Sequence, residues 1–392
     1  MGNRRADVVI VGGGPAGLTA ATSILAADPS LKGRVVVLEK AKYPREKYCA
    51  GAVGGRGDKI LDQLGIRPTV PSVAIDGISL RVVERERVVR MPGIGRVVRR
   101  IEFDAKLAEL ARGRGVEIVE NAKVDSVEAH DDGAIVDGSV GRFEARIVVG
   151  CDGVGSTVRK AMGLPPGNLR AQVLELDTEP VPSDRERGSI HFDAADRGLP
   201  GYYWDFPTLT GGRDLVCRGI YHLKIGDEEI DLQGRLGERL AAIGLDINAY
   251  KNKRFAERGI ECATSFAKGP LMLAGEAAGI DPVTGEGIAQ AIEYGSMVGP
   301  LVALALTGEA RLESWSQRFR ESRLGRDLAI RQRLVGHFFG PRRAELEHML
   351  VAGPSMMRAG CQHFGALPME PLTFAAAVAR LGAYLVRGVL AG

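Results

Sequence analysis

Cysteine, histidine and surplus charge are all scarce in this sequence of 392 residues. Its five cysteines are odd in number and widely spaced, and no CxxC pair occurs, so neither a disulfide framework nor a structural zinc site is expected. The six histidines show no HxH or HxxxH spacing, which predicts no metal site. The net charge is only +3, and no block of Lys and Arg is interleaved with aromatic residues, so no nucleic-acid partner is expected.

Long hydrophobic runs are missing as well. No uninterrupted apolar stretch reaches roughly 18 residues, and Met1–Asp7 is short and polar, so neither a membrane span nor a signal peptide is predicted. The nearest candidate, Leu372–Leu390, is interrupted by Arg380 and Arg387. Such an amphipathic segment either lies on a membrane surface or packs on the protein, and we favour packing. A cytoplasmic protein is therefore expected, with peripheral membrane contact as the open alternative.

Glycine is abundant, with 52 residues, and the first cluster follows an apolar strand. Val8–Val11 predicts a buried strand, Gly12–Gly17 a loop, Leu18–Ala27 a helix and Arg34–Leu38 a second strand that ends at Glu39. This order is that of a parallel βαβ unit, in which a G-x-G-x-x-G loop brings backbone and helix N-terminus to a pyrophosphate and an acid binds the ribose. The segment therefore predicts dinucleotide binding.

Three further segments favour FAD over NAD as that dinucleotide. Gly150–Gly153 follows the apolar strand Ile147–Val149, and Gly275–Gly279 follows the apolar strand Leu271–Leu273. Gly285–Ile288 then stands at the mouth of a helix, whose N-terminus suits the electron-rich pyrimidine end of a reduced flavin. The chain is thus predicted to be a flavoprotein.

Two other stretches alternate apolar and polar residues, which is typical of half-exposed antiparallel strands. One contains Ile78, Leu80 and Val82, and the other runs over 215–223. The predicted fold is α/β, with a Rossmann-type FAD-binding domain, an antiparallel-sheet substrate domain and a helical C-terminal region. We assign residues 1–75, 96–165 and 262–325 to the first, 76–95 and 166–261 to the second, and 326–392 to the third.

With these motifs, residues 5–325 resemble the FAD-dependent superfamily of p-hydroxybenzoate hydroxylase, which carries the same three fingerprints. Arg100–Leu107 is similar to its Arg-x-x-Phe-Asp-x-x-Leu stretch, so the resemblance implies that Arg100 faces FAD and that Asp104 lies in the first turn of a helix. Glu276 stands where that superfamily usually has Asp. The residues expected at FAD are Gly12, Gly14, Pro15, Ala16, Gly17, Glu39, Lys40, Cys49, Ala50, Arg100, Val124, Asp152, Gly153, Gly275, Glu276, Gly285, Gly287 and Ile288.

Two segments resemble the geranylgeranyl reductase branch of that superfamily. Pro44–Gly51 is similar to its Pro-x-x-Lys-x-Cys-x-Gly segment, and Tyr202–Pro207 to its Tyr-x-Trp-x-Phe-Pro motif, although Thr208 stands where that branch often has Lys. The resemblance implies Cys49 and Tyr202 as candidate catalytic residues. It implies a substrate-binding role for Tyr202, Trp204 and Phe206. Flavin halogenases have a related motif, from which Tyr202 and Phe206 depart.

These segments favour an enzyme that reduces carbon–carbon double bonds of a geranylgeranyl-type or related lipid by hydride transfer from reduced flavin. An FAD-dependent monooxygenase that hydroxylates or epoxidises an aromatic, polyketide or isoprenoid substrate is the alternative, because one fold serves both. A structural flavin or a redox-sensing partner is a third, minor reading. No second strand–GxGxxG–helix unit occurs, so the electron donor is expected to be NADPH or another external reductant that binds transiently, or an electron-donor protein.

The C-terminal region offers no interpretable motif. Its Arg-rich run, residues 318–343, is expected to be a solvated helix face, with a site for an acidic ligand such as a diphosphate as the alternative.

Overall fold

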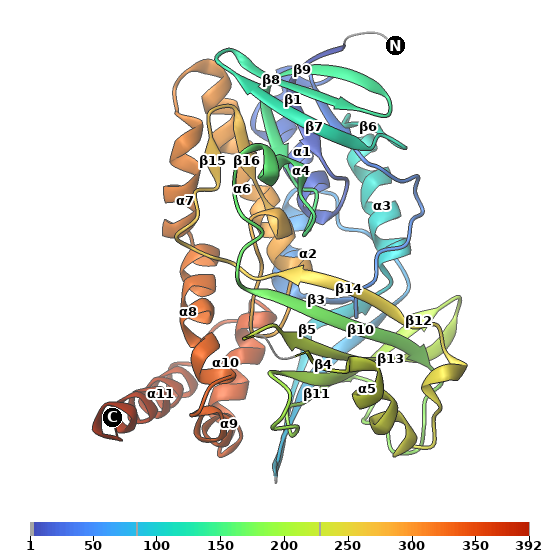
Figure 1. The fold of residues 1–392 in the computed structure, drawn as a ribbon, viewed down its shortest axis with the longest axis vertical. Helices are drawn as coiled ribbons and strands as arrows, with labels where there is room; N and C mark the ends of the chain where they lie inside the picture. Colours follow the sequence, from blue (N-terminus) through green and yellow to red (C-terminus); the bar gives the residue numbers. More distant parts are fainter. Residues whose placement is uncertain (1–3, 84, 227–228, 392) are drawn as a thin grey trace.

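The computed structural model describes residues 4–83, 85–226 and 229–391, with side chains described up to residue 386. Two eight-stranded sheets form its two halves. The strands that precede the glycine motifs lie in the upper sheet of Figure 1, and the long antiparallel strands lie in the lower one. The predicted fold class, a Rossmann-type half with a second antiparallel sheet and C-terminal helices, is confirmed.

The first sheet is a parallel core with an antiparallel ribbon. Its main path runs β15-β16-β9-β1-β2-β6, and β7 and β8 extend from β9. Its strands are β1 (Arg4–Val11), β2 (Val35–Leu38), β6 (Glu117–Val119), β7 (Val124–His130), β8 (Gly133–Gly138), β9 (Gly141–Gly150), β15 (Ala267–Lys268) and β16 (Leu271–Leu273). The strands β2, β1, β9 and β16 are parallel, and their buried Val and Ile runs are those expected of a sheet covered on both faces.

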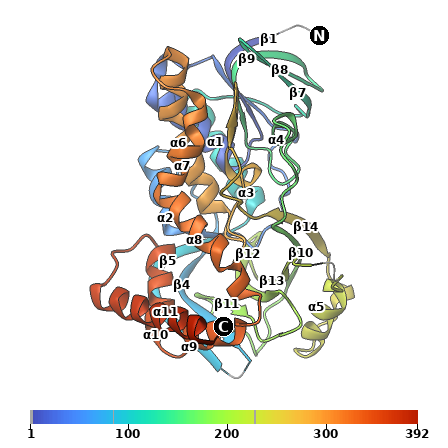
Figure 2. The same cartoon turned by 60° about the vertical axis from the view of Figure 1, so that its left-hand side comes forward.

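Helices α1 (Pro15–Ala27) and α6 (Ile288–Thr307) pack closely on each other beside this sheet (Figures 1 and 2). Their backbones approach at glycines: a Cβ built on Gly295 would lie 2.5 Å from the carbonyl oxygen of Ala16. By length and apolarity α6 is the one described helix that could cross a membrane, yet 56% of its apolar window is buried inside the protein. Its packing on α1 accounts for that apolarity.

The second sheet has the order β14-β10-β13-β12-β11-β4-β5-β3 and is antiparallel except for the β11–β4 pair. Its strands are β3 (Ala52–Gly54), β4 (Ser72–Val82), β5 (Arg85–Val98), β10 (Arg170–Thr178), β11 (Ser189–Asp193), β12 (Gly201–Thr210), β13 (Arg213–Leu223) and β14 (Lys253–Arg258). Residues 52–54 and 72–75, which the sequence places in the FAD-binding segment, pair in this sheet.

The prediction of a half-exposed strand over 215–223 is wrong, because in β13 all residues from Val216 onward are buried. One face packs against α5 (Leu232–Ala241), where Ile220 joins a core with Leu236. The opposite face, with Tyr221, joins a second core that C-terminal helices complete. The alternating sequence thus distinguishes the two faces of β13, but the protein covers both of them.

The remaining helices cover the sheets and connect them. The 3₁₀ helices are η1 (Pro29–Leu31), η2 (Ile247–Ala249), η3 (Gly275–Ala277) and η4 (Leu312–Ser314). The α-helices are α2 (Gly55–Gln63), α3 (Arg100–Gly113), α4 (Thr157–Ala161), α7 (Trp315–Glu321), α8 (Arg323–Phe338), α9 (Arg343–Val351), α10 (Pro354–Phe364) and α11 (Pro371–Ala391). Asp104 was expected in the first turn of α3. Because this helix begins at Arg100, Asp104 instead lies at the start of the second turn.

The C-terminal helices run from the side of the first sheet down to the second sheet, and α11 projects at the lower left of Figure 1. The Arg-rich run is not simply a solvated face. Arg343 is buried and donates to Glu347 at 2.6 Å, and Arg331 pairs with the buried Asp281. Arg331 and Arg343 are therefore already paired with acidic side chains of the protein itself.

Candidate functional site

The glycine loop between β1 and α1 forms the first wall of the site. Gly12 has φ +103°, and a side chain on Gly17 would collide with the carbonyl oxygen of Gly12, so both glycines are needed for the turn itself. Gly14 differs, because the nearest atoms to a Cβ there are guanidinium nitrogens of Arg45 and Arg100, each 4.0 Å away. The backbone at Gly14 is thus open to a ligand and faces two cations, as a pyrophosphate requires.

Charged side chains hold this loop in place. Glu39, directly after β2, accepts hydrogen bonds from the backbone N–H of Gly13 and of Ala41, both at 3.0 Å. Arg45 donates to the carbonyl oxygen of Gly13 at 3.2 Å and pairs with Glu39 at 3.2 Å. The sequence did not single out Arg45, which the structure places across the loop.

Arg100 and Asp104 form the next part of the wall. They make a bidentate pair on α3, with both nitrogen–oxygen distances 2.7 Å, and Arg45 reaches the same carboxylate at 3.1 Å. The pKa of Arg100 is raised because the attraction of Asp104 outweighs burial. Asp104 therefore holds both guanidinium groups beside Gly14.

Two carboxylates from the later motifs carry oxygens that lack partners. Asp152 accepts a hydrogen bond from the backbone N–H of Thr157 at 2.6 Å through Oδ2, while its Oδ1 is buried with no partner in the described part of the chain. Oε1 of Glu276 is in the same situation. A Cβ on Gly153 would lie 3.5 Å from Glu276 Oε2, so the two motifs face each other. Burial raises the pKa of Asp152.

These features fit FAD. The open backbone at Gly14 with its two arginines suits the pyrophosphate, and Glu39 beside the same loop is an acid of the kind that binds an adenosine ribose. The unpartnered oxygens of Asp152 and Glu276 can accept hydrogen bonds from hydroxyl groups of the ribityl chain. Glu276 thus keeps one carboxylate oxygen available for a ligand.

Cys49 lies beside Arg100 at the junction of the two halves. Its backbone N–H donates to Glu175 at 2.9 Å, and its sulfur accepts a hydrogen bond from the backbone N–H of Gly51 at 3.4 Å. Burial raises the pKa of the Cys49 thiol, and the positive charge of Arg100 only partly offsets this. The cysteine therefore stays a thiol at neutral pH.

An aromatic wall rises from β12 opposite the glycine loop. Tyr202, Trp204 and Phe206 all join the core on one face of the strand, as their alternation predicts. Tyr202 stacks on Tyr221 with ring centroids 5.1 Å apart and meets Phe192 edge-on at 5.4 Å. This face is continuous, rigid and apolar.

The tyrosine hydroxyls tie this wall to the loop before α6. Tyr221 donates to the carbonyl oxygen of Pro282 at 2.9 Å, and Tyr202 donates to the carbonyl oxygen of Thr284. Burial raises the pKa of both tyrosines well above its ordinary value. Their hydroxyl protons are thus held in structural hydrogen bonds.

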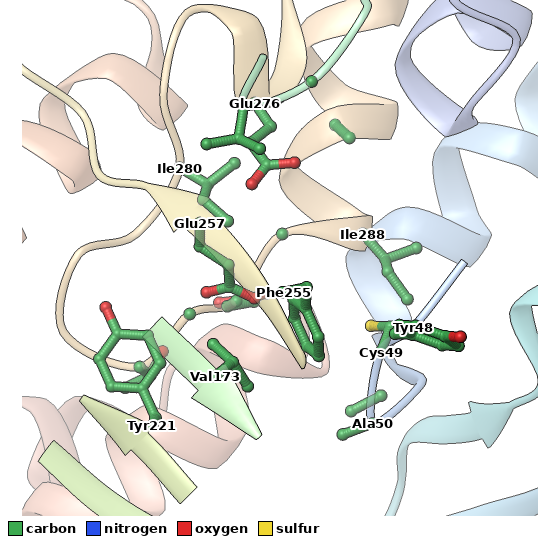
Figure 3. A pocket seen from close by; sticks show the side chains of 18 of the residues that line it. Tyr48, Cys49, Ala50, Val173, Tyr221, Phe255, Glu257, Glu276, Ile280 and Ile288 are labelled. Atoms are coloured by element: carbon green, nitrogen blue, oxygen red, sulfur yellow. The ribbon is translucent and has the colours of Figure 1, made fainter. Parts of the chain in front are cut away.

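A single cavity of about 970 Å³ joins the glycine loop to the aromatic wall. Figure 3 shows part of its lining, with Cys49 and Ala50 on one side and Tyr221 on the other. C-terminal helices close it with apolar side chains, which were not anticipated because no motif marks them. These are Phe338, Phe339, Leu350, Met356, Met357, Cys361 and Phe364. Their only sequence signal is apolar spacing along amphipathic helices.

The cavity brings together most of the residues predicted from the sequence. Tyr202, Trp204 and Phe206 line it, and so do Gly12, Gly14, Pro15, Ala16, Glu39, Lys40, Cys49, Ala50, Arg100, Val124, Asp152, Gly153, Glu276, Gly285, Gly287 and Ile288. Two predicted residues do not line it: Gly17 packs against the loop, and Gly275 packs against Ala16 of α1. The lining also includes Glu257 of β14, which carries no sequence motif. Which lining residues contact FAD stays a prediction.

Several known proteins are similar to this chain in sequence or in fold. A family described as FAD binding domain matches residues 5–193. Digeranylgeranylglycerophospholipid reductase 2 of Methanopyrus kandleri is 27% identical over 80% of this chain and 81% of its own length. Rifampicin monooxygenase of Streptomyces venezuelae is 29% identical over 78% of this chain and 65% of its own length.

A solved structure shares the whole fold. The geranylgeranyl bacteriochlorophyll reductase-like protein of Thermoplasma acidophilum superposes with a TM-score of 0.76 at 20% identity, covering 97% of this chain and 96% of that one. At this identity the match concerns the fold.

Proposed function

Because the chain belongs to the FAD-dependent oxidoreductases and has geranylgeranyl reductases among its relatives, we propose that it reduces carbon–carbon double bonds of a prenyl or related lipid substrate. The observation that carries the proposal is the cavity itself. Beyond the glycine loop it is lined by the aromatic residues of β12 and by apolar side chains of the C-terminal helices, together with charged groups that include Glu257, Arg331 and Glu347. The relatives' names supply the substrate class, and the apolar lining is consistent with it.

The size and lining of the cavity support a long apolar substrate beside a cofactor. Ligand sites usually measure roughly 300–1,000 Å³, and this one, at about 970 Å³, lies at the upper end. Trp204 and Phe206 give it one apolar wall, and Met356 and Phe364 give it another from α10. These two walls offer a prenyl chain apolar surface against which it can be buried.

When bound, FAD supplies the hydride that reduces a double bond. Tyr202 and Tyr221 hold the loop at the N-terminus of α6 through its carbonyl oxygens, so this chain presents the substrate against a fixed surface. NADPH, another small reductant or an electron-donor protein would restore the reduced cofactor. Cys49 and Tyr202 remain in the proposal as residues that border the reacting groups.

We also propose that α11 contacts a lipid bilayer, from which the substrate would enter. Leu372 is 86% exposed, and Phe374, Val378 and Val386 are each more than half exposed. The inner side of the same helix packs through Tyr384 onto a cluster with Leu350 and Met356, both of which line the cavity. The exposed apolar face thus lies just outside the cavity wall. Arg387 and Leu390, part of the segment expected to be amphipathic, fall outside the described side chains.

An anaerobic reoxidation experiment tests the reaction. Purified holoenzyme is reduced with dithionite, and geranylgeranyl diphosphate or a geranylgeranyl glycerolipid is added while the visible absorption band of oxidised flavin is followed. We expect the band to return without oxygen and the product to gain two hydrogens per double bond. If the band returns only on admission of air, the monooxygenase alternative replaces the reductase.

Binding to liposomes tests the role of α11. The double variant Leu372→Glu/Val378→Glu is expected to lose co-sedimentation with vesicles, whereas Val88→Glu, at a comparably exposed position on β5, is expected to keep it. Equal binding by all three proteins, or no binding by the wild type, would remove the bilayer from the proposal.

A further inference from the structure

Glu257 of β14 lies where the second sheet meets the FAD-binding half. Figure 3 shows its carboxyl group extending from the strand into the cavity. A Cβ placed on Gly285 would lie 2.7 Å from Glu257 Oε2 and 3.2 Å from the ring of Tyr221. The carboxyl group therefore reaches the glycine loop at the N-terminus of α6 from the substrate side.

This carboxyl group is unsatisfied within the described residues. Oε2 of Glu257 is buried and has no hydrogen-bond partner among them. Burial raises the pKa of Glu257 well above its ordinary value, and the nearby charge of Glu276 raises it further. Glu175 and Asp281 act in the same direction, while Lys47 opposes them. Burial and the neighbouring carboxylates therefore favour the protonated form of Glu257, and its Oε2 has no hydrogen-bond partner among the described residues.

Other acidic protons at the cavity are less available. The hydroxyl protons of Tyr202 and Tyr221 are donated to the carbonyl oxygens of Thr284 and Pro282. Removing either proton would weaken a contact that fixes the loop. Burial also raises the pKa of the Cys49 thiol above its ordinary value of 9.0, which makes the thiol a weaker acid still. Glu257 Oε2, in contrast, reaches the cavity with no hydrogen-bond partner among the described residues, so it can donate to a bound ligand without breaking a contact of the fold.

We propose that Glu257 is the proton donor in the reduction of the double bond; the inference rests on the proposed function. The alkene gains a hydride from the reduced flavin at one carbon and a proton from the Glu257 O–H at the other. Two C–H bonds form, while the π bond, the O–H bond of Glu257 and the N–H bond of the reduced flavin that supplies the hydride break. The substrate is thereby reduced by two electrons and the flavin is oxidised by two. The carboxylate that remains is stabilised by Lys47, which is exposed, until water returns its proton.

Three variants of the holoenzyme test this role. Glu257→Gln keeps the size of the side chain and removes the acid, Glu257→Asp keeps the acid on a shorter arm, and Glu238→Gln on the exposed side of α5 is the matched control. In anaerobic single turnovers with a geranylgeranyl lipid we expect Glu257→Gln to react about 10²- to 10⁴-fold more slowly. We expect Glu257→Asp to recover part of the rate and Glu238→Gln to match the wild type.

Two further measurements separate proton donation from a structural effect. The wild-type rate should fall as the pH rises through the pKa of Glu257, and this alkaline limb should vanish in Glu257→Gln. Independently of turnover, the infrared spectrum of the oxidised, substrate-free holoenzyme should contain a carbonyl band of a protonated carboxylic acid that Glu257→Gln lacks. FAD content must stay at the wild-type level.

Each alternative outcome is informative. A Glu257→Gln variant with the wild-type rate, or one that is slow but retains the alkaline limb, overturns Glu257 as donor and leaves the reductase standing. If the wild type itself transfers nothing to an alkene without oxygen, the proposed function fails, and the role of Glu257 fails with it.

Discussion

Replacing Glu175 should stabilise the protein in a pH-dependent way. Glu175 of β10 is 1% exposed, and burial raises its pKa from the ordinary 4.5 to about 7. One pKa unit corresponds to about 1.4 kcal/mol, so ionising this group in the folded protein costs about 3 kcal/mol. Lys253 lowers the pKa and Asp177 raises it, and both are included in that value.

The sign follows from proton binding. Between pH 4.5 and about 7 the folded protein keeps a proton on Glu175 that the unfolded chain has released, so this group makes the free energy of unfolding fall as the pH rises. Glutamine does not titrate, yet its amide oxygen can still accept the hydrogen bond from the Cys49 N–H. The stability of Glu175→Gln relative to the wild type should therefore rise by about 3 kcal/mol across this range.

Urea denaturation at a series of pH values from about 4 to 8, at one fixed FAD concentration, measures the difference. Titrating groups that do not interact with Glu175 affect both proteins alike and cancel. Glu238→Gln, at the surface of α5, controls for the chemical change from carboxylate to amide. A difference between Glu175→Gln and the wild type that stays constant with pH, or that falls as the pH rises, would refute the reasoning.

Three further substitutions have defined outcomes. Gly14→Ala should bind FAD more weakly while keeping the unfolding midpoint of the FAD-free protein, because its new Cβ has space in the fold and only blocks the ligand. Gly17→Ala should lower both the FAD affinity and the unfolding midpoint, because its Cβ collides with Gly12. Fluorescence titration and thermal melting distinguish the two variants, and an unchanged FAD affinity in Gly14→Ala would contradict the binding of FAD at this loop. Asp327→Asn should destabilise the protein by about 2 kcal/mol at neutral pH, because His363 and Arg331 lower the Asp327 pKa from 3.8 to about 2; the loss should disappear as the pH falls through 2. Trp204→Ala should cost about 3–5 kcal/mol of unfolding free energy, since the indole packs on Gly219, and a change below about 1 kcal/mol would show that the wall is not packed as described.

The first half of the protein was predictable because its chemistry is local. A G-x-G-x-x-G loop, its strand, its helix and Glu39 lie within one βαβ unit, and their positions follow from period and turn chemistry alone. The later motifs at Asp152 and Glu276 also follow buried strands, so the sequence placed them at the same edge of one sheet. Tyr202, Trp204 and Phe206, which the resemblance assigned to one motif, lie together in one core cluster.

The tertiary structure decided what encloses the site. Phe338 and Met356 come from helices whose sequences contain only amphipathic spacing, and that spacing does not say which surface a helix covers. Glu257 likewise has no motif, and the strand pairing of β14 with β10 brings it opposite Gly285. The sequence by itself determined the cofactor-binding unit, because backbone geometry near a phosphate restricts residue types over a few positions. The apolar chamber and its buried acid arise from contacts between distant segments, which only the folded chain brings together.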